Sequence, residues 1–496
     1  MQAPGGNWSD LRTKTSSVGL TFLRLSLLAL LPIGGCAAYQ ARQLTSSAVE
    51  KALTIPSGEV LQQGALQLKH PILRPMELDP RQPLSPEAAA VLAVLINPVL
   101  RADRDRAGVS EAQLIIAGLL PNPQLTYSKD FVTAGPGITT PFGIGIAWDF
   151  TSLITRGAKV RAARAALESI RMDIAWSEWQ AAEAAKAAVF DEVAIEAQLT
   201  QAQAVDQRLK ENADVIRGAY DRRQRTVLDM SAAQSASESA HATALALEQQ
   251  LVDQKHVLLR ALGLPSDTPV TLRPDIGLPS RLTLPSAQDL SNGIENRRLD
   301  LIALQRGYQS QEESVRAAVL SQFPKINLGG NRARDNTDVY SVGFAATADL
   351  PIFDRNQGGI ALGRATRQKL FDEYIARVYT ARSDIVLLLA DIDSLTRQIA
   401  AATAALPALR QLVGTYRLAL QNGNADVFSY YTAWNSLSQK EIAVEALKQR
   451  LVDQGIALEL ASGENLAQSL VPDSTRRAAD LSIFPDSSPT PQAIPP

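Results

Sequence analysis

The sequence predicts a mainly α-helical protein with a small β part, in which one unit occurs twice in tandem. Each unit consists of a helix, a β-hairpin, a very long helix and a return helix. Residues 158–217 contain neither Gly nor Pro, which at about 1.5 Å per residue allows roughly 90 Å of continuous helix. Four short segments alternate apolar and polar side chains, as strands with one apolar face do. Matching segments in the two halves of the chain indicate the duplication.

The composition argues against several classes of protein. The 496 residues carry a net charge of −2, whereas nucleic-acid binding needs clustered basic charge. A single Cys excludes a disulfide framework, and three scattered His do not suggest a zinc centre. No paired carboxylates and no phosphate-binding loop are recognisable. We therefore expect no enzyme, no catalytic residue, no cofactor or metal site and no nucleic-acid partner.

The first residues indicate export and lipidation. Residues 1–35 resemble a signal peptide, with a basic segment, a short apolar stretch over 25–31 and small residues after it. The small residues end at Cys36, the only Cys of the chain, as in a bacterial lipobox whose Cys becomes acylated. The alternative is an ordinary signal peptide with an incidental Cys. We expect residues 36–84 to be a lipidated linker, because acyl chains anchor a protein in lipid.

The duplication appears when the sequence is compared with itself at a shift of 200 residues. Residues 249–254 (QQLVDQ) correspond to 449–454 (QRLVDQ), and Asp149 corresponds to Asp349. The period is too long for a solenoid, so each copy is a large unit of several elements. We expect the first repeat over 85–263 and the second over 296–463. A Pro-rich segment over 264–295 joins them, and a tail over 464–496 is expected to be disordered.

Local signals define the elements of the first copy. Ser85, Pro86 and Glu87 form a helix start, from which a helix is expected to run to about Gly118. Strands follow at about 123–131 and 141–150. After the long helix, a turn near 218–226 leads into a return helix that ends near 262. The long helix is rich in Ala, which favours close packing of helices.

The second copy repeats this order. Its strands are expected at about 324–331 and 339–350, its long helix at about 360–421 and its return helix up to about 463. In each copy the helix before the hairpin and the return helix together are about as long as the long helix, so they are expected to stack along it.

Two hairpins supply four strands, which are too few to close a transmembrane barrel. A barrel in lipid must be closed and has at least eight strands. Three chains would supply twelve, so we expect a homotrimer with a 12-stranded transmembrane β-barrel. The same three chains would gather their helices into a hollow periplasmic α-helical barrel. Such an assembly is a conduit.

Several motifs in this order resemble the TolC-like outer membrane efflux family, over about residues 36–463. They are the lipobox at Cys36, residues 121–125 (PNPQL), 323–326 (FPKI) and 350–358 (LPIFDRNQG), and the turn segments 218–234 and 418–434. The resemblance implies an outer membrane channel, lipid-anchored and spanning, with a long periplasmic part. It also implies two partners, a periplasmic adaptor and an inner-membrane pump of the resistance-nodulation-division class.

The transported substrate is weakly encoded. Residues 353–358 (FDRNQG) resemble the heavy-metal efflux branch most, which suggests divalent metal cations. The alternatives are a multidrug or other small-molecule outlet and a type I secretion outlet. A periplasmic adaptor or coiled-coil scaffold lipoprotein is a further alternative, but it would not need two hairpins of this kind.

The resemblance assigns the adaptor contact to the two turns at the periplasmic tip. The matching residues are Arg225, Thr226, Val227, Leu228, Asp229, Gly423, Asn424, Asp426 and Val427, within segments 225–229 and 424–428. The family usually has a Gly in each turn, whereas Arg223 takes that place in the first. Family members often carry acidic gate residues where this chain has Ser429 and Thr432, so Asp426 is the nearest substitute. Asp426 and Asp229 could instead serve only as helix caps.

Pro407 is the second gate candidate. It lies about fifteen residues before the second turn, where the first copy has Gln207. A Pro inside a helix removes a backbone hydrogen bond and kinks the helix. The kink would bend the second helix pair inward and close the tube, or it is merely tolerated.

Overall fold

The computed structural model describes residues 38–79, 81–134, 139–422 and 424–466. The predicted signal peptide, Cys36, Gly423 and most of the predicted tail lie outside the described residues. The chain divides into two compact units, one up to Thr54 and one from Ile55. In the first unit, helix α2 (Ser46–Leu53) begins at Thr45, whose side chain accepts a hydrogen bond from the backbone N–H of Ala48.

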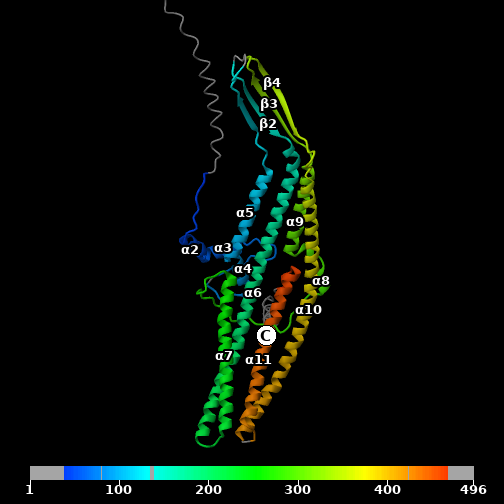
Figure 1. Cartoon of the computed structure of the whole chain (residues 1–496). Helices are drawn as coiled ribbons and strands as arrows, with labels where there is room; N and C mark the ends of the chain where they lie inside the picture. Colours follow the sequence, from blue (N-terminus) through cyan, green and yellow to red (C-terminus); the bar gives the residue numbers. More distant parts are fainter. Residues whose placement is uncertain (1–37, 80, 135–138, 423, 467–496) are drawn as a thin grey trace, which may run out of the picture. The chain divides into compact units, whose positions relative to one another are not determined.

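The second unit holds the elements expected from the sequence, in an order that occurs twice (Figure 1). Its first part contains α3 (Gly58–Leu66), α4 (Pro86–Ile96), α5 (Pro98–Gly118), β1 (Gln124–Lys129), β2 (Phe142–Asp149), α6 (Thr151–Asp221) and α7 (Val227–Leu262). Its second part contains α8 (Ala287–Ser291), η2 (Ile294–Asn296), α9 (Leu299–Leu320), β3 (Lys325–Arg334), β4 (Tyr340–Asp349), α10 (Gln357–Gln421) and α11 (Val427–Ser462). Figure 1 shows the sheet at one end of this unit and the turns α6–α7 and α10–α11 at the other.

The helix expected over 85–118 is two helices. It breaks at Asn97, because Pro98 lacks an N–H and forces the residue before it out of the helical region. The Asn97 side chain accepts a hydrogen bond from Val99 N–H and so caps α5. Its amide also donates to the carbonyl of Ala261 at 3.1 Å, which ties this break to the end of α7.

Both long helices exceed their predicted bounds. Helix α6 has 71 residues, roughly 105 Å at 1.5 Å per residue, and includes Gly157 and Gly218. Helix α10 has 65 residues and continues through Pro407. Both helices are held by tertiary packing along their length, which outweighs the local cost of single Gly or Pro residues.

The helices pack side by side through regularly spaced apolar residues. Helix α6 packs against α7, α9 and α11, and α10 packs against α9 and α11. The half of the unit that ends in the turns is therefore ordered α7, α6, α11, α10. The buried face of α10 repeats every seven residues, as in a coiled coil: Ile385, Ile392, Ile399, Leu406 and Val413.

The segment expected to be a linker includes residues that pack inside the second unit. Leu61 and Ala65 of α3 are buried in a cluster with residues of α4. Leu84 pairs with Leu272 through two backbone hydrogen bonds, so the Pro-rich segment between the repeats is attached beside α4. Within the described residues, no helix is long and apolar enough to cross a membrane.

The four strands form one antiparallel sheet in the order β1-β2-β3-β4. Leu125 pairs with Ile146, and Gly330 pairs with Phe344, so these residues share one face. Most residues of that face are apolar and exposed, up to 100% for Phe344. The other face consists of small and polar residues, including Thr126, Ser128, Asn327, Asn331 and Thr347. The sheet is thus amphipathic.

Candidate functional site at the helical turns

The two turns between the long helices are built in the same way. After α6, Gln224 N–H donates to the carbonyl of Ala219 at 2.8 Å, and after α10, Asn424 N–H donates to that of Ala419 at 2.8 Å. This bond closes a helix end in the Schellman motif, which needs a left-handed residue just before the donor. In the first turn that residue is Arg223, with φ of 61°. Arg223 therefore adopts the left-handed conformation at the position where the family resemblance leads us to expect Gly.

Each return helix begins with a side-chain cap. Thr226 and Asp229 form a reciprocal capping box at the start of α7, with bonds of 3.1 Å in both directions. Asp426 caps α11 by accepting from the backbone N–H of Ser429 at 2.7 Å and from its hydroxyl at 2.8 Å. These hydrogen bonds lower the pKa of Asp426. Asp426 therefore serves as a cap and also keeps an exposed negative charge.

The apolar residues of the two turns differ in exposure. In the first turn Val227 and Leu228 are exposed, at 59% and 77%. In the second, Val427 is 1% exposed and packs in a cluster with Tyr430 and Tyr431. Its side chain is therefore not accessible at the surface of this chain. Phe428, the next residue, is exposed and takes the place on the surface that was expected for Val427.

The two turns are linked by a contact between the copies. The guanidinium of Arg225 lies 3.5 Å from the carbonyl of Leu420, near the end of α10. Behind the turns, the Trp434 indole donates to the Tyr430 hydroxyl at 2.8 Å, and Arg208 stacks over Trp434. The tip therefore joins α6, α10 and α11 through polar as well as apolar contacts.

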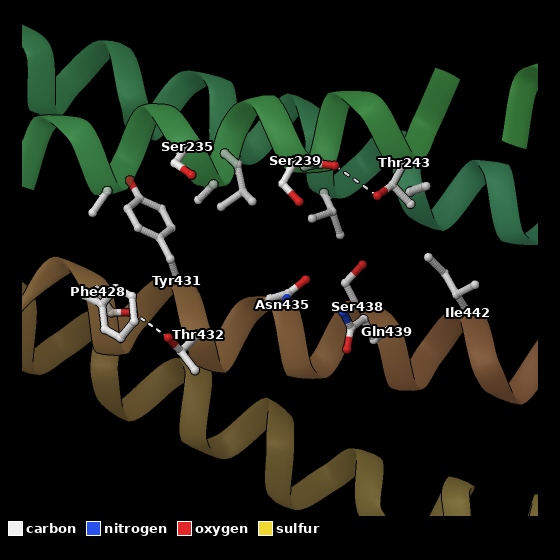
Figure 2. Close-up of a pocket in the computed structure, with 16 residues that line it drawn as sticks. Ser235, Ser239, Thr243, Phe428, Tyr431, Thr432, Asn435, Ser438, Gln439 and Ile442 are labelled. Carbon is white, nitrogen blue, oxygen red and sulfur yellow. Dashed lines mark hydrogen bonds between the residues drawn. The ribbon is translucent and has the colours of Figure 1, made fainter. Parts of the chain in front are cut away.

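A groove of about 310 Å³ lies between α7 and α11 above the turns. Figure 2 shows hydroxyl and amide side chains facing it from both helices. They include Ser235, Ser239 and Thr243 on α7 and Thr432, Asn435 and Gln439 on α11. Phe428 lines the same groove. The groove therefore presents mainly hydroxyl and amide groups, together with the ring of Phe428.

Pro407 lies on the exposed side of α10, directly after the buried Leu406. Residue 403 consequently lacks the helical hydrogen bond that an N–H at 407 would donate to its carbonyl. The two gate candidates therefore flank the same turn: Pro407 lies in α10, before the turn, and Asp426 lies at the start of α11, after it. Their effect on an opening stays a prediction.

A buried charged cluster lies farther from the turns, and the sequence patterns gave no sign of it. Lys186 of α6 is 3% exposed and donates to Glu183 at 3.0 Å and to Glu459 of α11 at 2.7 Å. The Trp179 indole donates to Glu183 at 3.0 Å. Burial raises the pKa of Glu459 to about 8 against the opposing charge of Lys186. Burial by itself would lower the pKa of Lys186, but the interactions with Glu183 and Glu459 outweigh it. The pKa of Lys186 is therefore raised, and the amine stays charged.

A pair of acids lies beside this cluster. Asp191 of α6 and Asp453 of α11 are hydrogen-bonded to each other, and the Gln449 amide donates to Asp191 at 2.7 Å. Burial and the neighbouring carboxylate raise the pKa of Asp453 to about 7. Two interacting carboxylates in a buried site share a proton, because both cannot be ionised there without a large cost. No cluster of three or more potential metal ligands occurs among the described residues.

These features define a class of protein in which a small amphipathic sheet is mounted on paired helices far longer than those of a globular domain. Residues 290–464 match the family described as outer membrane efflux protein. Over this stretch, about a third of the chain, the sequence is similar to that family.

Individual relatives agree with this assignment. Outer membrane protein OprJ of Pseudomonas aeruginosa is 26% identical over 202 residues, which cover 37% of this chain and 42% of OprJ. The match thus spans less than half of that relative. A solved structure of CusC has a TM-score of 0.66 at 18% identity, covering 81% of this chain and 99% of that chain. The outer membrane protein VceC of Vibrio cholerae has a TM-score of 0.64 at 17% identity, covering 77% and 96%.

The two structural likenesses show the fold. The matching family, OprJ and VceC are all described as outer membrane proteins, which agrees with the expected location at the outer membrane. The roles of the turn residues and the lipidation of Cys36 stay predictions.

Proposed function

We propose that the protein is the outer membrane channel of a tripartite efflux system, a passive trimeric duct that carries substrates from an inner-membrane pump and a periplasmic adaptor to the outside. The observation that supports this most is the amphipathic sheet. Its apolar face is exposed, including Val342 at 80%, while its opposite face is small and polar. A sheet with these faces suits a barrel with lipid outside and water inside.

The ends of the sheet support the same orientation. Phe142 and Tyr340 pack together at the loop end, and Trp148 and Phe150 at the helix end. Aromatic residues form belts of this kind at both surfaces of a membrane. Arg334 lies over the Phe142 ring at 5.4 Å, where its charge reaches the membrane surface. In this proposal β1 and β4, the edge strands, pair between chains, and three chains make 12 strands.

The periplasmic end supplies the partner surface. The adaptor contacts the exposed turn residues Val227, Leu228 and Phe428, with Arg225 and Asn424 beside them, and reaches into the groove between α7 and α11. Val427 is excluded from this surface because it is buried. Cys36, acylated, anchors the chain to outer membrane lipid. The pump supplies the energy, so the duct itself performs no catalysis.

Asp426 is proposed to contribute to the gate through its charge. Asp426→Asn keeps a good capping residue and removes the charge, whereas Asp426→Ala removes both. We expect Asp426→Asn to reduce cation selectivity of the pore without lowering thermal stability. Asp426→Ala costs about 1 kcal/mol of stability as well. Unchanged selectivity in both variants, measured in planar bilayers, would reduce Asp426 to a cap.

Pro407 is proposed to set the inward bend of α10 that narrows the tube. Pro407→Ala restores the helical hydrogen bond and is expected to raise basal conductance through a straighter α10. Equal conductance of the variant and the parent protein contradicts this role.

The substrates we propose are divalent heavy-metal cations, on the resemblance of residues 353–358. A multidrug or type I secretion outlet is the alternative. The test is growth of a deletion strain, with and without the gene restored, across divalent metals, hydrophobic drugs and detergents. Sensitivity confined to metals such as cobalt, zinc or cadmium supports the proposal. Sensitivity to drugs alone assigns a multidrug outlet, and no sensitivity at all argues against efflux.

A further inference from the structure

Among the described strand residues, positive charge on the apolar face of the sheet occurs only at the end that carries the hairpin loops. The last row before these loops takes one residue from each strand in turn: Lys129, Phe142, Arg334 and Tyr340. Arg332 lies on the same face in the next row, about 7 Å closer to the centre of the sheet. We call Lys129, Arg332 and Arg334 the loop-end cations.

The helix end of the same face is uncharged. Its strand residues are apolar: Leu125, Ile146, Trp148, Ile326, Leu328, Ala346 and Ala348. Both ends carry a pair of packed aromatic rings, so an aromatic belt at each membrane surface does not explain the difference. Cations at one end indicate that the membrane surface at that end is the negatively charged one.

The two guanidiniums of this face converge on one ring. Arg332 and Arg334 lie 5.5 and 6.0 Å from the centroid of the Tyr340 ring, which is 52% exposed. Because Tyr340 belongs to the last row, the Arg332 side chain extends from its deeper row toward the loops, as long cationic side chains do in lipid. An anion beside both guanidiniums would offset the repulsion between them.

Acidic side chains of the hairpin loops neutralise the loop-end cations only in part. Asp338 lies 3.4 Å from Arg334. Asp335 instead accepts hydrogen bonds from its own loop. The backbone hydrogen bonds of β1 and β2 continue through Asp130, so strand alternation places it on the face opposite Lys129. The other two loop-end cations have no ion pair among the described residues.

We propose that the loop-end cations bind the phosphate groups of a phosphorylated glycolipid, lipopolysaccharide, in the outer leaflet of the membrane. The loops lie at the end of the sheet away from the long helices (Figure 1), so in the proposed channel they meet this leaflet. This inference rests on the proposed outer membrane channel and specifies a lipid that it binds.

The surroundings of the cations favour a lipid over free phosphate. Val342 and Phe344 follow on the same face and are 80% and 100% exposed. A ligand that carries phosphates next to acyl chains covers these apolar side chains and meets the cations in one binding event. Guanidinium groups also match the oxygens of a phosphate in geometry.

Binding of lipid A, the phosphorylated lipid part of lipopolysaccharide, to the purified full chain in detergent tests this inference. We expect the parent protein to bind lipid A about tenfold more tightly than the same lipid without its phosphates. Lys129→Gln/Arg332→Gln should lose this preference while leaving the contacts of Arg334 in place. Lys159→Gln/Lys325→Gln is the matched control, because it removes two exposed positive charges near the helix end of the sheet and should keep the preference.

The charge-keeping variant Lys129→Arg/Arg332→Lys should also keep the preference. Equal affinity of the parent protein for lipid A with and without phosphates overturns the inference, and this comparison holds even if a variant fails to fold. Equal losses in the two Gln double variants overturn it too, because the loss would then follow total charge and not position. Equal affinity for phosphatidylglycerol overturns the assignment to a glycolipid.

Fractionation and mass separate this inference from the proposed function. If the parent protein is in the outer membrane with the mass of several copies but has no preference for phosphorylated lipid A, the lipid site is wrong while the channel stands. If it is a single copy or lies outside the outer membrane, both the site and the proposed channel fail.

Discussion

The two copies of the repeated unit have the same elements but not the same chemistry at their contacts. Where the copies meet inside the chain, the contact holds a buried Lys186 between Glu183 and Glu459. The equivalent residues on the outer helices are Ser383, Val386 and Leu259. Equivalent positions can thus carry a buried ion cluster in one copy and small or apolar side chains in the other.

The largest effect is expected from breaking the cluster. Lys186→Met leaves Glu183 and Glu459 buried without their cationic partner, which is expected to cost about 3–5 kcal/mol of stability at a pH where a buried carboxylate stays ionised. Thermal unfolding of the purified protein in detergent measures the loss.

The matched control introduces, at each of three positions, the residue found at the equivalent position of the other copy. The triple variant Glu183→Ser, Lys186→Val and Glu459→Leu removes all three ionisable groups together. It is expected to recover most of the lost stability, because a buried ion cluster replaced by apolar residues is often neutral. If the triple variant is no more stable than Lys186→Met, the loss of stability does not come from unpaired buried charge, and this explanation is wrong.

A smaller, pH-dependent effect is expected at the acid pair. The pKa of Asp453 is raised to about 7 in the folded chain from an ordinary value near 3.8. Its contribution to stability is therefore complete below about pH 4 and is lost as the pH rises through about 7. Asp453→Asn keeps a hydrogen bond to Asp191 and removes this loss, so its unfolding midpoint at pH 8 should exceed that of the parent protein by several degrees.

The difference between variant and parent should shrink as the pH falls toward 5. The exposed Asp393 supplies the control, since Asp393→Asn should leave the pH profile of stability unchanged. A constant offset between Asp453→Asn and the parent across this range would contradict the shared proton.

The smallest effect is expected at the first turn. Arg223 has a left-handed backbone with φ of 61°, which suits Gly better than a residue with a side chain. Arg223→Gly should stabilise the protein by about 0.5–1 kcal/mol. Its neighbour Arg222, with φ of −86°, has no such strain, so Arg222→Gly should be neutral or destabilising. If the two substitutions change stability equally, the left-handed backbone at Arg223 does not destabilise the protein.

The sequence predicted the elements well where a pattern is local and repeated. Alternation identified all four strands, and the lack of Gly and Pro in 158–217 identified α6. Gly157 and Gly218 made α6 look shorter than it is, because tertiary packing outweighs single helix-breaking residues. The break at Asn97 was readable from Pro98 but was hidden by an otherwise helical pattern.

The site was predicted less completely, because its decisive features join distant parts of the chain. The segments of the two turns were identified, but the burial of Val427 and the exposure of Phe428 depend on packing against α6 and α10. The Lys186–Glu459 contact joins residues 273 positions apart, and neither residue stands out in its own helix. The repeat does contain one usable signal. Charged residues that replace small or apolar ones at equivalent positions mark where the two copies differ in partner.

The mass of the complex extracted from the outer membrane tests the central claim most directly. Native mass spectrometry in mild detergent should give three copies of the chain, which is the number that turns four strands into a closed 12-stranded barrel. A single copy as the main species in intact, folded protein would contradict the trimeric duct.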